Sequence, residues 1–453
     1  MLTRRNALIA MAGAACLRGA EDPWSQLPAI LKRIQAPKFP NRAFDITRYG
    51  AKEGGKVDNT DAFRKAIEDA GHAGGGRVVV PEGVFLTGAI HLKSNVNLVV
   101  PKGATLKFNP DPKLYPIVLT RFEGMECMNF SAFVYALDQQ NVAITGGGTL
   151  DGQSSCDHWW PWSGKGGCGT GAGDQRKARA ALMDMVEKDV PVAQRVIGAG
   201  GFLRPMFVQP YRCTNVLIEG ITITNSPMYE VHPVLCRNVT VRGVTVSSHG
   251  PNNDGCDPES SVDVLIDGCT FDTGDDCIAI KSGRNGDGRR LQAPSENIVV
   301  QNCEMKDGHG GVTLGSECSG GIRNVFAQDC RMDGPNLERV LRFKNNAVRG
   351  GLIEHVFMRN VKVGQVSRAA IEVDFYYEEA EKGGFTPLVR DVEVVNLEVR
   401  KMQNAWSLRG FKNAPVQNIR LRDCRFEEAA KPNVTENVEG LKLENVTLNG
   451  KKV

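Results

Sequence analysis

An eight-residue unit, VLIEGITI at 216–223, recurs as VTVRGVTV at 239–246 and as VLIDGCTF at 264–271. Apolar and polar residues alternate in each unit around a central Gly, Asn or Asp. Alternation of period two is typical of short strands with one buried face, and steps of 22 to 36 residues between units are typical of a β-solenoid. The unit therefore predicts one coil of a repeating β-structure. Its first apolar residue falls at Val216, Val239, Val264, Ile298, Val325, Val356, Val392, Ile419 and Leu441.

The predicted fold is all-β, a single-domain right-handed parallel β-helix over residues 44–453. A chain of 453 residues exceeds the usual size of one core, but stacked coils remove this limit because each coil needs only its neighbours. A helix from about Thr60, its expected cap, to Ala73 is predicted to cover the open end of the core. Residues 151–205 interrupt the pattern and are predicted to be a loop insertion with a short helix.

The first twenty residues have the pattern of an export signal. Arg4 and Arg5 precede an apolar run at 7–15, and small residues continue to Ala20. The start faintly resembles a twin-arginine signal, and the export route stays open. Residues 21–43 form a separate N-terminal segment. Since no other apolar stretch reaches eighteen residues, we expect an exported protein, periplasmic or extracellular, without a membrane span.

Global charge does not indicate a partner. The chain has 55 basic and 52 acidic residues, and the predicted signal carries three basic residues and no acid. The remainder is balanced, so any attraction for a polyanion must be local. No basic run is interleaved with aromatic residues, which argues against nucleic-acid binding.

The thirteen cysteines are mostly predicted to be core residues. Cys269, Cys303, Cys330 and Cys424 occupy a repeat position that Ile, Val or Leu fills elsewhere. Cys156 and Cys168, in the insertion, could form a disulfide. No Cys or His spacing resembles a zinc site, and no metal or cofactor is expected.

Two coils carry polar residues at the same place after an inward cysteine. Asp275 follows Cys269 by six residues, and His309 follows Cys303 by six residues. Equivalent positions in consecutive coils lie one strand spacing apart, about 4.8 Å. The two side chains are therefore expected to be neighbours, with Asp276 beside them.

Further charged residues extend this strip on both sides. Asp254 lies in the coil before Asp275 and reaches nearly the same place. Arg342 and Lys344 lie in the coil after His309. Three carboxylates, an imidazole and two cations are thus expected on one strip of surface.

This combination suits glycoside hydrolysis. Mutual repulsion should raise the pKa of at least one carboxyl and give a proton donor beside a base. Arg342 and Lys344 would hold a carboxylate, as in a uronic acid. The alternatives are turn-forming aspartates, a calcium-dependent pectate lyase, and a non-catalytic carbohydrate-binding or adhesive β-helix.

Four motifs resemble those of the polygalacturonases of glycoside hydrolase family 28, in the family's order. They are NNDG at 252–255, GDDC at 274–277, GHG at 308–310 and RFK at 342–344. The resemblance covers nearly all of the chain after the signal. Asn253 and Phe343 are mild departures, from Thr and Ile.

The resemblance implies a role for each residue of the strip. Asp275 would be the general acid, Asp254 and Asp276 would hold and deprotonate water, and His309 would tune the acid. The reaction would invert the anomeric carbon of α-1,4-linked galacturonate in pectin, and His309 favours homogalacturonan over a rhamnogalacturonan-type substrate. The expected substrate-binding residues are Arg342, Lys344, Asn252, His232, Lys281 and Tyr377.

The segment KSGRN at 281–285 with DGR at 287–289 resembles the bacterial, exo-acting branch. An exo-enzyme closes one end of its cleft, and the 151–205 insertion is predicted to supply that wall. Its tryptophans, Trp159, Trp160 and Trp162, either pack the loop or stack on sugars.

Overall fold

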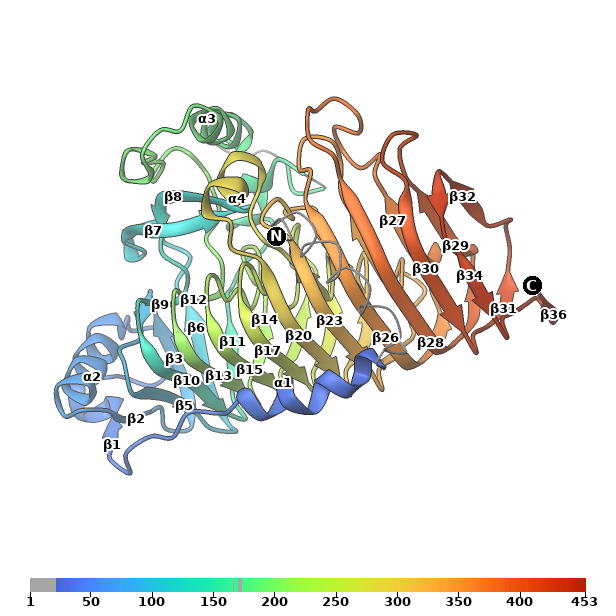
Figure 1. Ribbon diagram of the computed structural model, residues 1–453. Helices are drawn as coiled ribbons and strands as arrows, with labels where there is room; N and C mark the ends of the chain where they lie inside the picture. Colours follow the sequence, from blue (N-terminus) through green and yellow to red (C-terminus); the bar gives the residue numbers. More distant parts are fainter. Residues whose placement is uncertain (1–21, 166, 170–172) are drawn as a thin grey trace, which may run out of the picture.

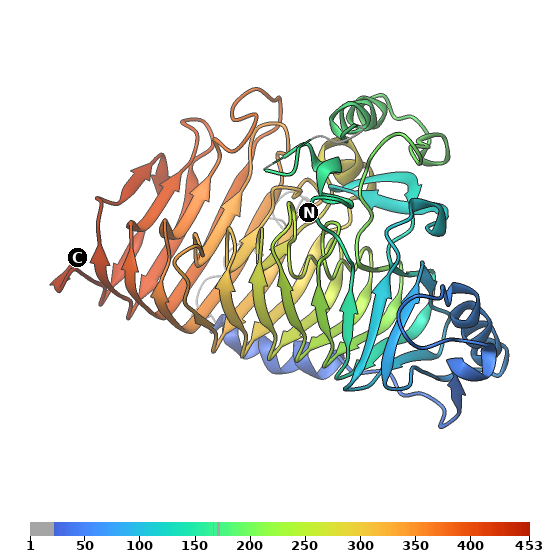
Figure 2. The same cartoon turned by 180° about the vertical axis from the view of Figure 1, so that it is seen from behind.

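The computed structural model describes residues 22–165, 167–169 and 173–453, and the predicted signal at 1–20 lies outside them. The chain forms a right-handed parallel β-helix whose coils stack into one elongated body (Figures 1 and 2). The predicted fold class is confirmed. None of the helices described is both long and apolar enough to cross a bilayer.

Three strips of parallel strands form the sides of the body. The first strip contains β1 (Ala43–Asp45), β2 (Gly76–Val79), β5 (Val96–Val100), β10 (Gln140–Gly146), β13 (Thr214–Glu219), β15 (Arg237–Arg242), β17 (Val262–Asp267), β20 (Ser295–Gln301), β23 (Ile322–Gln328), β26 (Leu352–Gln365), β28 (Leu388–Met402) and β30 (Val416–Arg422). The second contains β3 (Gly83–Thr87), β6 (Ala104–Phe108), β11 (Thr149–Asp151), β14 (Thr222–Thr224), β16 (Thr245–Ser248), β18 (Thr270–Thr273), β21 (Glu304–Asp307), β24 (Arg331–Met332) and β31 (Arg425–Ala429).

The third strip carries the site on its outer face. It contains β4 (Ile90–His91), β9 (Val134–Leu137), β12 (Val208–Tyr211), β19 (Ile278–Ile280), β22 (Val312–Leu314), β25 (Leu341–Lys344), β27 (Ala369–Asp374), β29 (Asn404–Arg409) and β32 (Val434–Glu436). Single parallel bridges from Val208 through Val231 and Cys256 to Ile278 join β12 to β19.

The register of the repeat is the predicted one. Val216 pairs with Val239, which pairs with Val264, and the series continues along the chain. The fifth position of each unit adopts a left-handed backbone, for example φ 74° at Gly220 and 56° at Asn302. This conformation explains why only Gly, Asn and Asp occur there.

A helix covers the N-terminal end of the core. Helix α2 (Thr60–His72) buries an apolar face over the first coil. The prediction that Thr60 caps this helix was wrong: Asn59 occupies the N-cap position, and the Asp58 carboxylate accepts the Thr60 N–H at 2.8 Å. At the other end β35 (Thr447–Leu448) pairs antiparallel with β36 (Lys451–Lys452).

Two excursions from the coils stand together beside the third strip (Figure 1). One is the hairpin of β7 (Ile117–Phe122) and β8 (Met125–Phe130), which the sequence analysis missed; the other is the predicted insertion with α3 (Arg176–Glu187). With α4 (Asn285–Leu291), which contacts both, they form what we call the N-terminal wall.

The insertion is tied internally by the predicted disulfide between Cys156 and Cys168. Its tryptophans pack the loop rather than line the cleft. Trp159 is buried against the rings of Tyr115 and Trp162, and the Trp160 indole donates to the Ser226 carbonyl at 2.9 Å. The repeat-position cysteines, Cys269, Cys303, Cys330 and Cys424, are buried in the core as predicted.

The N-terminal segment lies across the outer face of the first strip (Figure 1). Its short helix α1 (Leu27–Arg33) and Trp24 cover an apolar patch that includes Phe326. The Arg359 guanidinium lies 3.9 Å from the Trp24 ring centroid, and Arg33 pairs with Asp263 at 2.8 Å. The segment therefore holds several coils together.

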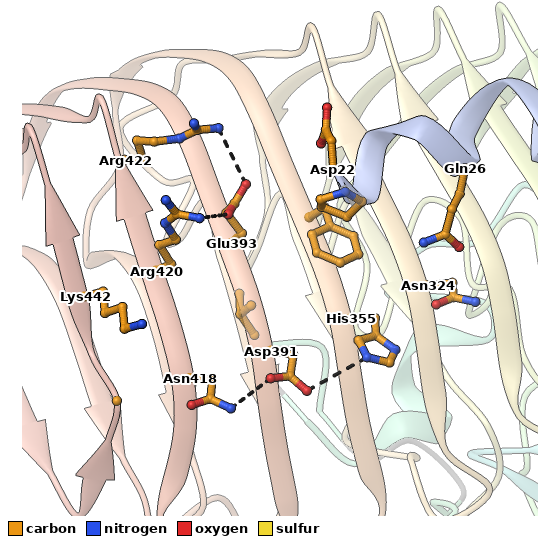
Figure 3. Close-up of a pocket in the computed structure, with 14 residues that line it drawn as sticks. Asp22, Gln26, Asn324, His355, Asp391, Glu393, Asn418, Arg420, Arg422 and Lys442 are labelled. Carbon is orange, nitrogen blue, oxygen red and sulfur yellow. Dashed lines mark hydrogen bonds and ion pairs between the residues drawn. The ribbon is translucent and has the colours of Figure 1, made fainter. Parts of the chain in front are cut away.

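A groove of about 840 Å³ runs beside α1 on this face (Figure 3). Several of its charged side chains are paired with one another. Glu393 faces Arg420 at 3.1 Å and Arg422 at 3.8 Å, and Asp391 lies 3.9 Å from His355. The groove contains none of the predicted site residues, so it is separate from the site.

Trp24→Ala should lower the free energy of unfolding by about 3 kcal/mol, because the indole fills the contact between segment and coils. Chemical denaturation measures the change. Circular dichroism of the backbone is the readout, because it does not depend on the substituted tryptophan. Val57→Ala, at a side chain that is 50% exposed, is the control. Equal stability of the two variants would show that the segment contributes nothing to the coils.

Candidate active site

Three carboxylates meet on the outer face of the third strip. Asp275 and Asp276 lie in the turn between β18 and β19, and Asp254 lies in the coil before. Oxygen atoms of all three lie within 4.8 Å of one another. His309, one coil further on, places its Nδ1 2.9 Å from Asp275 Oδ1, and its backbone N–H donates to the Asp275 carbonyl. The predicted neighbours are thus neighbours in the structure.

Asp276 is a buried and fully engaged carboxylate. Lys344 Nζ lies 2.7 Å from its Oδ2, while Arg342 Nη1 at 3.4 Å and the Thr313 hydroxyl at 2.9 Å donate to Oδ1. Both cations come from β25, where Phe343 between them points into the core. Burial alone would raise the pKa of Asp276, but the charges of Lys344 and Arg342 outweigh it and hold this pKa far below its usual range.

Asp254 and Asp275 differ in protonation. Burial, aided by the charge of Asp275, raises the pKa of Asp254 to about 8. Burial also opposes ionisation of Asp275, but the hydrogen bond with His309 overcomes it and lowers the pKa of Asp275. The same bond raises the pKa of His309. A proton shared by the two carboxyls therefore favours Asp254, and the charges of Asp275 and His309 favour each other.

The remaining predicted binding residues divide into two groups. Asn252 and Tyr377 line the cleft, and the Tyr377 ring lies 5.7 Å from the Arg342 guanidinium. Lys281 also borders the cleft but is only 2% exposed. Its ammonium lies 3.5 Å from Asp254 Oδ2, so it supports a carboxylate from behind.

His232 does not reach the cleft. Its side chain is fully buried, with Nε2 2.8 Å from Glu259 Oε2 and Nδ1 3.1 Å from the Gln209 amide. Glu259 is also paired with Arg121 of β7 at 3.0 Å. The expectation that His232 contacts substrate is corrected: it belongs to the buried contacts that anchor the hairpin.

Two supporting residues were missed by the sequence analysis. The Asn253 side chain accepts from the Ser248 hydroxyl and the Gly250 N–H, both at 2.7 Å, and donates to two carbonyls. Arg204, fully buried, donates to Asn252 Oδ1 at 2.8 Å. Together they fix the turn that carries Asp254. Asn253 stood inside a recognised motif, but Arg204 had no local signal.

The cleft around the triad has a volume of about 430 Å³ and an excess of positive charge. Among the described residues, eight basic side chains and six acidic ones line it, besides His309. The basic ones are Lys165, Arg179, Lys281, Arg284, Arg339, Arg342, Lys344 and Arg368. Such a cleft favours an anionic ligand.

The three carboxylates fit a metal poorly. Asp254 faces Lys281, Asp275 faces His309, and Asp276 faces Lys344 and Arg342. A calcium site needs oxygen ligands whose negative charge is free for the ion. Here protein cations already compensate that charge.

A carboxyl with a raised pKa beside carboxylates with lowered pKa values, in a cleft on a parallel β-helix, has the features of a glycoside hydrolase. Residues 198–448, more than half of the chain, match the profile of glycosyl hydrolases family 28. The chain belongs to this family.

Several known proteins are similar over most of the chain. The crystal structure of a hyperthermoactive exopolygalacturonase from Thermotoga maritima superposes with a TM-score of 0.92 at 46% identity, covering 95% of this chain and 96% of that one. A probable polygalacturonase from Vitis vinifera is 26% identical over 91% of this chain and 81% of its own length. An exo-poly-alpha-D-galacturonosidase from Dickeya chrysanthemi is 28% identical over 75% of this chain and 58% of its own length.

Asp275→Asn should lower the pKa of His309, because it removes the carboxylate charge that stabilises the imidazolium. Titration of the histidine Cε1–H resonances by NMR measures the shift. The control is Asp272→Asn, which removes a carboxylate 3.0 Å from His249 instead. An unchanged His309 titration in Asp275→Asn would rule out the ion pair.

Proposed function

We propose that the protein is an exo-acting polygalacturonase that hydrolyses α-1,4-galacturonosyl linkages of homogalacturonan. The observation that carries the proposal is the carboxylate triad with Arg342 and Lys344 beside it, in a cationic cleft. Guanidinium and ammonium groups bind the carboxylate of a uronic acid better than they bind a neutral sugar. The 46% identical exopolygalacturonase of Thermotoga maritima supports the same activity.

Asp275 is the proposed general acid. Its side chain is 19% exposed, whereas those of Asp254 and Asp276 are 4% and 0% exposed, so Asp275 is the carboxyl that reaches a bound sugar. Because the pKa of Asp254 is the higher of the two, the catalytic proton must move from Asp254 to Asp275 in the reactive complex. The short separation of their oxygens permits this transfer through one water molecule.

Ionised Asp254 then takes a proton from the attacking water, and the fixed negative charge of Asp276 beside it stabilises the positive charge that develops on that water. Asp276 itself is a poor nucleophile because Lys344, Arg342 and Thr313 engage its oxygens and burial shields them. We therefore propose a single displacement with inversion. The two catalytic carboxyl groups of inverting glycosidases are commonly about 6.5–9.5 Å apart. The carboxyl groups of this triad are closer together. Attack by water, not by a carboxylate, therefore depends on the contacts that engage Asp276, not on separation.

The shape of the cleft supports cleavage at a chain end. On one side Glu123 of the hairpin turn, Lys165 of the insertion and Arg179 of α3 close it. On the other side it continues into a polar groove of about 450 Å³ over the following coils, and Arg368 lines both. We infer that a bound polymer extends from the triad over the following coils, with its end at the N-terminal wall.

A related hydrolase activity on a branched, rhamnogalacturonan-type pectin is the second candidate. The presence of His309 at hydrogen-bond distance from Asp275 favours the homogalacturonan assignment. Export to the periplasm or beyond, directed by residues 1–20, accords with a polymeric substrate.

Polygalacturonate incubated with the wild type in chelating buffer should release only mono- or digalacturonate. Asp275→Asn should reduce this release by about 10²- to 10⁴-fold, the usual contribution of a general acid. Chromatography of the products measures both. The control is Asp272→Asn, the same change in β18, the strand that precedes the turn of Asp275, and it should keep full activity.

Other product patterns separate the alternatives. A ladder of oligomers would preserve the hydrolase and reverse the exo assignment. Unsaturated products that absorb in the ultraviolet would identify a lyase. Release of sugars from branched pectin alone would select the second candidate.

A further inference from the structure

The tip of the β7–β8 hairpin lies directly against Arg284 and Glu317, two residues at the border of the catalytic cleft. The Arg284 N–H donates to the Gly124 carbonyl at 3.0 Å. A Cβ at Gly124 would lie 2.7 Å from Arg284 N and 2.9 Å from Glu317 Cγ, and Gly124 has φ +79°. Only glycine permits this approach.

Arg284 then joins the tip to the interior. Its guanidinium, 2% exposed, lies 3.1 Å from Glu123 Oε2 and 3.2 Å from Glu317 Oε1. Glu123 also pairs with Arg179 of α3 at 2.6 Å, so two parts of the N-terminal wall share one carboxylate. The wall is thus fixed by ion pairs around the largely buried Arg284 guanidinium.

The series of ion pairs continues to the catalytic carboxylate. The second oxygen of Glu317 lies 3.4 Å from Lys281 Nζ, and the same ammonium lies 3.5 Å from Asp254 and 3.6 Å from Asp257. Lys281 is also 4.9 Å from the centroid of the Tyr229 ring. The positive charge of the Lys281 ammonium is therefore shared between Asp254 and Glu317.

Buried ions of this kind cannot move independently. Displacing one leaves its partner uncompensated in a medium of low dielectric constant, which is strongly unfavourable. The cations keep the pKa of Glu317 below its usual range despite burial, so this carboxylate remains a partner for Lys281. The ion pairs thus form a continuous series from the hairpin tip through Arg284 and Glu317 to Lys281.

We propose that Arg284 is a positioning residue that couples the closed end of the cleft to the catalytic centre, through Glu317 and the Lys281 ammonium to Asp254. The inference rests on the proposed exo activity. Displacement of Arg284 loosens the N-terminal wall and draws Lys281 toward Glu317 and away from Asp254.

The test compares Arg284→Lys and Gly124→Ala with the wild type on polygalacturonate. Both variants should release oligomers longer than the dimer and lose about 10²-fold in kcat/KM, the cost of a misplacement of about 1 Å. The pH at which kcat/KM falls on the alkaline side should rise, because Asp254 loses the nearby charge that favours its ionised form. Gly124→Ala keeps every charge, so it still tests the proposal if Arg284→Lys folds poorly.

Arg195→Lys is the matched control. Arg195 is a buried arginine of the same wall, paired with Asp287 at 2.7 Å, but it makes no contact with Glu317 or Lys281 among the described residues. The Arg195→Lys variant should have a lower melting temperature, but its reaction products and its pH profile should be those of the wild type. Unaltered products and pH profiles in folded Arg284→Lys and Gly124→Ala would overturn the proposal, whereas a wild type that itself releases a ladder would refute the exo assignment instead.

Discussion

In-register parallel stacking of the coils is the constraint on which the site depends. Asp254 and Lys344 are 90 residues apart in the chain, yet stacking brings their coils onto one strip of surface. A slip of one residue in β25 would point Phe343 outward and both cations inward. The left-handed turn at the fifth position of each unit maintains this register along the body.

Unequal compensation of charge gives the stacked carboxylates different properties. Asp276 has two cations in contact that hold its pKa low, whereas among the described residues Asp254 pairs with Lys281 alone and burial raises its pKa to about 8. Environments that separate the pKa values of neighbouring carboxyls supply an acid and a base at one pH. The same buried charges connect the catalytic centre to the N-terminal wall, so catalysis and cleft shape share one set of contacts.

The sequence predicted those features of the structure that a local pattern of residues determines. The period of two and the Gly, Asn or Asp turn yielded the coils, and equal offsets from Cys269 and Cys303 placed Asp275 beside His309. Features that depend on distant partners were missed. The place of His232 is set by Glu259 and Arg121, which come from other parts of the chain. The Glu123–Gly124 pair could have indicated the turn of the hairpin, but it was not interpreted in this way. Helix α1 lies outside the repeat, so the repeat gave no indication of it.

The central claim is a single displacement by water at a triad whose most buried carboxylate is held by cations. Proton NMR of the first sugar released from polygalacturonate tests it most directly, because hydrolysis of an α-linkage with inversion yields the β-anomer. The account predicts β-galacturonate first, followed by slow mutarotation. The α-anomer as first product would contradict it and would make one of the triad carboxylates a nucleophile.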